Sequence, residues 1–331
     1  MNPTMNKIAP WIRGAVLIAL PFVYHEPYPL HILVLVLIWS FVYTSWSMMG
    51  RFGLVSLGHG GFMGIGAYTT ALLWNYLHVS PWLGIPAGML AAAVTAVLIG
   101  YPCFRFRILG HNFALLTLAL SAIVLQVITA TRDTTGGSLG FTPNRYHGGS
   151  SVYALQFNDK ITWYLIALGV WAVGIAIRYW VERSMLRYAL EAIAEDEDAA
   201  AAVGVHVTAE KLKITVLSAM MTALAGAIYC QYQMFISPDT VSGIAVSLQM
   251  VFASVVGGIY VPLGPTIGAL ITILLTEFLR IWFGTKAIGW DNVIYGTLLV
   301  VFIIFLPQGL VGSLAGRFQP SPPVRSPAPA E

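Results

Sequence analysis

Residues 27–50 read PYPLHILVLVLIWSFVYTSWSMMG, a stretch without a single Asp, Glu, Lys or Arg. A helix rises about 1.5 Å per residue and needs roughly 20 apolar residues to cross the bilayer core, so this stretch is long enough to span it. Six more uncharged runs cover residues 52–104, 108–131, 161–177, 214–238, 240–276 and 292–316. Only 9% of the 331 residues are charged, whereas soluble domains average about 25%. The sequence therefore predicts a membrane protein.

Two of these runs are long enough to hold two spans each. Residues 52–104 contain a break at Val79-Ser80-Pro81, and residues 240–276 contain one at Pro262-Leu263-Gly264-Pro265. Proline ends helices and glycine permits a turn, so each of these two runs holds two spans and the total is nine. A short tenth span is predicted at residues 11–25. The predicted fold is an all-α transmembrane bundle over residues 1–318. Residues 319–331 are rich in proline and predict a disordered tail.

The distribution of Lys and Arg predicts the orientation. With ten spans and a cytoplasmic N-terminus, twelve of these residues fall on the cytoplasmic side and five on the other, as the positive-inside rule requires. Both termini are then cytoplasmic. The cytoplasmic connection 182–211 carries seven of the fourteen acidic residues and an alanine run, residues 199–202. Alanine is the best helix former, so we expect short helices there, outside the lipid.

This connection contains a motif. Asp198, Ala199 and Ala200 are followed by Gly204 and, ten residues later, by Ile214. The spacing resembles the cytoplasmic pattern of ATP-driven importer permeases, which is Glu-Ala-Ala, three residues, Gly, nine residues and Ile. A short alanine-lined helix fits a cleft on a partner, and the glycine lets the chain turn away. An ordinary solvated connection is the alternative. The residues predicted to couple to the ATPase are Glu191, Glu195, Asp198, Ala199, Ala200 and Gly204.

A wider resemblance covers residues 50 to 312. The segment Ser56-Leu57-Gly58-His59-Gly60-Gly61-Phe62 looks like the early glycine-rich span of branched-chain amino-acid permeases of the LivM type. Further short matches follow in the same order: Thr135-Gly136-Gly137, Phe235-Ile236-Ser237-Pro238-Asp239, Gly257-Gly258, Gly264-Pro265-Thr266 and Pro307-Gln308-Gly309-Leu310. The resemblance implies a multi-pass subunit of the bacterial inner membrane. It also implies a second homologous permease, two cytoplasmic ATP-binding subunits that hydrolyse ATP, and an extracytoplasmic substrate-binding protein.

One departure leaves the substrate open. Members of that family commonly have Gly-Glu-Ile-Val-Arg where this chain reads Ser121-Ala122-Ile123-Val124-Leu125. Ionisable groups within a membrane are costly and usually functional, so urea, short amides or another amino acid are alternatives to a branched-chain amino acid. Candidates for the translocation path are His59, Gln126 and Gln249. The alternative for His59 is a buried side chain bonded to a neighbouring backbone, and for the glutamines it is hydrogen bonding between helices.

Other functional classes fit the sequence less well. A stand-alone channel or secondary carrier would need an ion site or proton relay, and acids are scarce within the spans. An integral membrane enzyme would need clustered His, Asp or Glu, but the seven histidines are scattered. We predict no catalytic residue, metal ligand or cofactor, and no basic cluster suggests nucleic acid.

Overall fold

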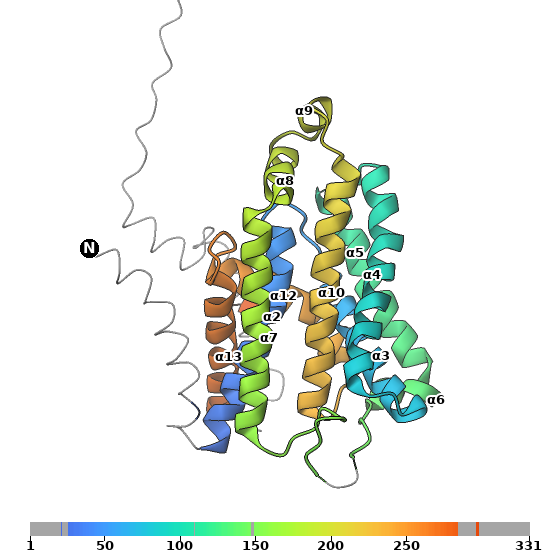
Figure 1. The fold of residues 1–331 in the computed structure, drawn as a ribbon, viewed down its shortest axis with the longest axis vertical. Coiled ribbons are helices and arrows are strands. Elements are labelled where there is room, and N and C mark those ends of the chain that lie inside the picture. The colour runs from blue at the N-terminus through green and yellow to red at the C-terminus, as the bar shows by residue number, and fades with distance from the viewer. Residues whose placement is uncertain (1–20, 22–25, 109, 147–148, 284–295, 298–331) are drawn as a thin grey trace, which may run out of the picture.

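The computed structural model describes residue 21 and residues 26–108, 110–146, 149–283 and 296–297 (Figure 1). Its helices are α2 (Pro27–Gly50), α3 (His59–Leu77), α4 (Pro81–Arg105), α5 (Gly110–Ala130), α6 (Arg132–Thr135), α7 (Lys160–Arg183), α8 (Met185–Glu195), α9 (Glu197–Ala202), α10 (Val207–Gln233), α11 (Pro238–Val241), α12 (Ile244–Gly257) and α13 (Gly264–Phe283), with one 3-10 turn, η1 (Gly137–Leu139). Among these residues β pairing is limited to two isolated bridges. The all-α fold class is confirmed.

Seven segments of the described chain are long and apolar enough to cross a membrane: α2, α4, α5, α7, α10, α13 and residues 238–257, which comprise α11 and α12. Helix α3 is also 19 residues long and runs beside α4 and α10 (Figure 1). Both predicted breaks are present, because α3 ends before Pro81 and α12 ends before Gly264. The predicted spans at 11–25 and 292–316, and the tail at 319–331, lie outside the described residues.

Helix α2 forms the centre of the bundle. Its apolar residues occupy all sides, and 94% of its most apolar 18-residue window is buried, against 28% for α5 and for α7. A helix that is hydrophobic all round packs inside other helices, and α2 packs against α7, α10, α12 and α13. The partly exposed helices α4, α5 and α7 therefore form the periphery.

Helices α3 and α10 meet through their backbones. A Cβ atom on Gly66 would lie 2.0 Å from the carbonyl oxygen of Ala223, and one on Gly226 would lie 2.1 Å from that of Met63. Small residues allow membrane helices to approach this closely, and van der Waals packing then holds them together. The glycine-rich span noted in the sequence thus fixes α3 against α10.

The charged residues gather at the two ends of the bundle. Helices α8 and α9 stand at one end, beyond the last turns of α4 and α7 and the first turn of α10 (Figure 1). Arg51, Arg107 and Lys211 lie at this end, since each pairs with an acid of α8 or α9. The opposite end holds α6 and the start of α7. Of the basic residues counted on the cytoplasmic side in the sequence, these three therefore lie around α8 and α9.

Candidate functional site

The connection 182–211 folds into two short helices, as its alanine content predicted. Helix α8 is amphipathic: Leu190 and Ile193 are buried against the bundle, whereas Met185 and Tyr188 on the other side are exposed. Residues three and four apart share one face of a helix, which explains this division. The apolar face therefore anchors α8 and leaves Met185 and Tyr188 exposed.

Helix α9 has a defined beginning and end. Asp196 caps it, because one carboxylate oxygen accepts hydrogen bonds from the backbone N–H groups of Asp198 and Ala199, both at 2.9 Å. At the other end Gly204 adopts a φ of +94°, which glycine accepts without a Cβ penalty. Its N–H donates to the carbonyl of Ala201 at 3.0 Å. The chain therefore turns at Gly204, as the motif predicted.

The alanine run does not present all of its side chains outward. Ala200 is only 3% exposed and packs into the hydrophobic core. Ala199, Ala201 and Ala202 are exposed, and Val203 is 80% exposed. We expected Ala200 to be among the small side chains that enter a partner; its burial instead makes it an internal contact of the connection. We call the exposed set, residues 199 and 201–203, the α9 face.

Ion pairs hold α9 to the neighbouring helices. Asp198 accepts a 2.8 Å hydrogen bond from Arg107, just after α4, and Glu197 accepts one of 2.6 Å from Lys211 of α10. The Asp198–Arg107 pair is well exposed, so it contributes less than about 1 kcal/mol. The Lys211 side chain is only 5% exposed, and breaking its pair would leave a buried charge uncompensated. The Glu197–Lys211 pair is therefore the stronger anchor.

A second group of charges joins α8 to α2 and α7. Glu191 of α8 accepts from Arg187 at 2.7 Å and from Arg51 at 3.3 Å. Glu182, near the end of α7, pairs with Arg51, with Arg187 at 3.6 Å and with Arg178 at 3.9 Å. We call these five side chains the charge cluster. Of the other predicted coupling residues, Glu195 is exposed at the end of α8.

Arg178 is the residue of this cluster that sequence reasoning missed. The charge count assigned it to the cytoplasmic side, but it is 1% exposed inside the bundle. Its guanidinium donates to the Ser47 hydroxyl at 2.7 Å and to the Ile259 carbonyl at 2.9 Å. The only sequence signal was its place at the end of the uncharged run 161–177.

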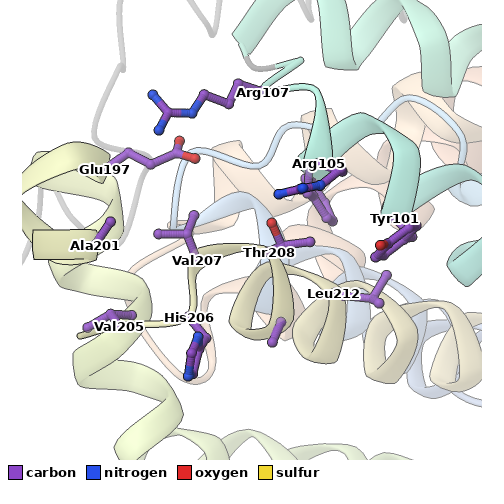
Figure 2. A pocket seen from close by; sticks show the side chains of 12 residues that line it. Tyr101, Arg105, Arg107, Glu197, Ala201, Val205, His206, Val207, Thr208 and Leu212 are labelled. Atoms are coloured by element: carbon purple, nitrogen blue, oxygen red, sulfur yellow. The ribbon is translucent and has the colours of Figure 1, made fainter.

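A cavity of about 590 Å³ lies beside α9. Tyr101 and Arg105 of α4 line one side, and Glu197 and Ala201 of α9 line another, as Figure 2 shows. The first turn of α10, with Thr208, completes the wall. The cavity therefore combines a basic wall, an acidic wall and small side chains.

The candidate path residues lie on three different helices. His59 is fully buried on α3, where its ring nitrogens bond to the hydroxyls of Ser56 at 3.0 Å and Ser218 at 2.7 Å. Its partners are thus hydroxyl groups, where a backbone partner was the alternative considered from sequence. Gln126 is exposed on α5, and Gln249 is partly buried on α12. None of the three lines the 590 Å³ cavity. Across the described ranges, no group of three or more His, Cys, Asp and Glu side chains could hold a metal ion.

Comparisons with known proteins find relatives of this chain. The sequence model of a family described as "Branched-chain amino acid transport system / permease component" matches residues 28–303. The high-affinity branched-chain amino acid transport system permease proteins LivM of Salmonella typhimurium and of Escherichia coli are each 29% identical over 284 residues. The alignments cover 80% of this chain but 65% of either LivM, so the chain matches less than two thirds of their length.

A second relative belongs to the same kind of system. The high-affinity branched-chain amino acid transport system permease protein LivH of Escherichia coli is 27% identical over 278 residues, covering 80% of this chain and 87% of LivH. Among solved structures, "PsaBC from Streptococcus pneumoniae in complex with Fab" covers 86% of this chain and 94% of that chain at a TM-score of 0.46 and 13% identity. A TM-score of that size assigns no common fold.

Proposed function

The chain belongs to the family of branched-chain amino acid transport system permease components, and from this premise we propose that it is the membrane-spanning subunit of an ATP-driven importer. Its cargo would be a branched-chain or related amino acid delivered by an extracytoplasmic binding protein. ATP would be hydrolysed by two separate cytoplasmic subunits, and a second, homologous permease would complete the path. The names of the LivM and LivH relatives support a pair of this kind.

The connection formed by α8 and α9 is the observation that carries the proposal. It stands beyond the end of the bundle, it is capped at Asp196 and Gly204, and it is held by Lys211 and the charge cluster. A movement of α9 would therefore reach α10 through Glu197, and a movement of α8 would reach α2 and α7 through Glu191 and Glu182. Such a rigid, anchored element suits the transmission of force from an ATPase to the membrane helices.

The α9 face offers the contact surface. Its alanine side chains leave room for a partner's backbone, and Val203 provides an exposed apolar anchor beside the cavity that Arg105 and Glu197 line. Interfaces combine an apolar centre with a polar rim in this way. In this arrangement the end that carries α8 and α9 faces the cytoplasm, which agrees with the excess of Lys and Arg there.

A charge placed in this surface tests the proposal. The permease pair would be expressed with its ATPases, and Val203→Asp would be compared with Leu139→Asp. Leu139 is a similarly exposed apolar residue in η1, which contacts α6 at the opposite end of the bundle. We expect Val203→Asp to reduce ATPase co-purification about tenfold and to abolish uptake, because a carboxylate would be desolvated in the interface. Leu139→Asp should retain its ATPases.

The competing outcomes are distinct. If Val203→Asp inserts normally, keeps its ATPases and transports at the normal rate, the connection is only a solvated loop. If the unmodified complex transports urea or short amides and ignores leucine, then the missing acid and base at residues 121–125 reflect a different cargo. In that case the subunit role would stand and the amino acid would be replaced.

A further inference from the structure

A second cavity, of about 410 Å³, lies at the end of the bundle opposite α8 and α9. The last turn of α10 contributes Gln231 and Tyr232, and the residue that follows the helix is Met234. The first turn of α7 contributes Trp163, and the loop between α6 and α7 contributes Arg145. Small-molecule sites typically measure about 300–1,000 Å³, so this cavity has the size of a site for a small solute. In the proposed orientation it opens on the extracytoplasmic side.

Gln231 sets this cavity apart from an ordinary crevice. The residue is 0% exposed, yet neither its Oε1 nor its Nε2 finds a hydrogen-bond partner among the described residues. Burying an amide without partners is unfavourable, and such groups in native proteins call for an explanation. Gln231 lines the cavity, and its amide carries one acceptor and two donors that a hydrogen-bonding ligand would satisfy.

The neighbouring polar side chains are already engaged. The amide of Gln156, which also lines the cavity, accepts from the Tyr146 N–H and donates to the Asn144 carbonyl, both at 2.9 Å. The Trp163 indole N–H donates to the Phe157 carbonyl at 3.0 Å. These bonds shape the wall, and among the lining side chains the Gln231 amide is the buried one without a hydrogen-bond partner within the described part of the chain.

The remaining walls supply a charge and an apolar surface. Among the lining residues only Arg145 is charged, and it is exposed at the rim. Trp163 and Tyr232 pack edge to face with ring centroids 5.3 Å apart. The Tyr232 hydroxyl also receives a 3.4 Å hydrogen bond from Lys160, which fixes the ring. A guanidinium attracts carboxylates, and a rigid aromatic wall with a methionine accepts aliphatic side chains.

We infer that this cavity binds the incoming amino acid directly, before it crosses the membrane. The ligand class is a zwitterionic amino acid with an apolar side chain. Its carboxylate would pair with Arg145, its polar end would satisfy the Gln231 amide, and its side chain would lie against Trp163, Tyr232 and Met234. The inference rests on the proposed function and adds a recognition site within the permease itself.

The test is direct binding to the assembled permease–ATPase complex in nanodiscs, without the binding protein, which would mask the signal. Radiolabelled L-leucine is the probe. We expect saturable binding to the unmodified complex and a Kd about tenfold higher for Gln231→Met, since removing a hydrogen-bonding partner weakens binding by that order. The melting temperature of Gln231→Met should stay the same or rise, because a buried unpaired amide is replaced by an apolar side chain of similar length.

A second variant and two competition measurements test which chemical groups of the ligand are recognised. Arg145→Gln should also raise the Kd for leucine, and leucinamide, which lacks the carboxylate, should compete poorly; urea should not compete. The control Thr95→Val should leave the Kd unchanged, since that hydroxyl bonds within its own helix to the Ala91 carbonyl. Equal competition by urea or leucinamide would overturn the assigned ligand class.

A purely structural role for Gln231 predicts the opposite changes in melting temperature and Kd. If Gln231→Met lowers the melting temperature and leaves the Kd unchanged, Gln231 serves packing alone and the inference fails. Absence of saturable leucine binding to the unmodified complex overturns it as well. Failure of the proposed function would show elsewhere, as absent ATP-dependent leucine uptake by the complete transporter supplied with its binding protein.

Discussion

Arg178 donates from its guanidinium to the main-chain carbonyl of Ile259 at 2.9 Å, across 81 positions of sequence. The bond ties α7 to the turn between α12 and α13, and a second one, to Ser47, ties α7 to α2. One helical turn further along, Glu182 joins this buried base to Arg51. The charge cluster thus connects the core of the bundle to α8.

This ion-pair network predicts that replacing Glu182 destabilises the protein more than replacing Arg178 does. Glu182→Gln removes the carboxylate that Arg178 and Arg51 share. The two arginine side chains are only 2% and 11% exposed, so each would lose an acidic partner in a buried position. Breaking a buried ion pair from one side costs about 3–5 kcal/mol. Arg178→Met costs less, about 1–3 kcal/mol, because Glu182 retains Arg51 and Arg187. Thermal unfolding of the purified subunit measures both; the reverse order would refute the role of Glu182 as the shared partner.

Adjacent alanines of α9 should respond differently to the same substitution. Ala200→Trp places a large side chain in a buried position, so it should destabilise the connection by about 1–3 kcal/mol and expose it to protease. Ala199→Trp lies on the α9 face and should leave stability unchanged while weakening ATPase co-purification. Limited proteolysis combined with pull-down separates the two effects. Equal loss of stability in both variants would contradict the assigned faces.

The close contact of α3 and α10 predicts a strong dependence on Gly66. In Gly66→Ala the new methyl group would lie 2.0 Å from the Ala223 carbonyl oxygen, so the helices must separate, at a cost of about 1–3 kcal/mol. Gly169→Ala on α7 is the matched control, because no atom lies within 4 Å of its added Cβ. There the change should stabilise by about 0.5–1 kcal/mol. A melting temperature for Gly66→Ala equal to that of the parent chain would show that the two helices are not in backbone contact.

The orientation can be measured by labelling. In a background in which Cys103 and Cys230 are replaced, Ser138→Cys and Ala201→Cys place single thiols at opposite, exposed ends of the bundle. We expect an impermeant thiol reagent added to intact cells to label position 138 and to spare position 201, because the basic end should face the cytoplasm. Lysed cells, in which both positions should react, provide the control. Labelling of position 201 alone in intact cells would invert the topology.

Several features followed from the chain alone. Uncharged runs of 17 residues or more are longer than a membrane strand of about 9–11 residues and satisfy their backbone in lipid as helices. The all-α fold and the breaks at Pro81 and Gly264 were therefore predictable from run length and proline placement. The short helices of the connection followed from its alanine content, and a turn at Gly204 followed from the motif. All of these are local properties, set by residues within a few turns of one another.

The tertiary structure decided what depends on facing and on distant partners. In a run of small apolar side chains the sequence does not mark which side of a short helix packs inward, so it could not reveal that Ala200 points inward while Val203 points outward. Nor could it show that Arg178 is enclosed by α2 and the turn after α12, or that the amide of Gln231 is left unpaired beside a polar cavity. The burial and the hydrogen-bond partners of each of these side chains depend on which helix packs against it. Only the packing of segments far apart in the sequence determines that neighbour.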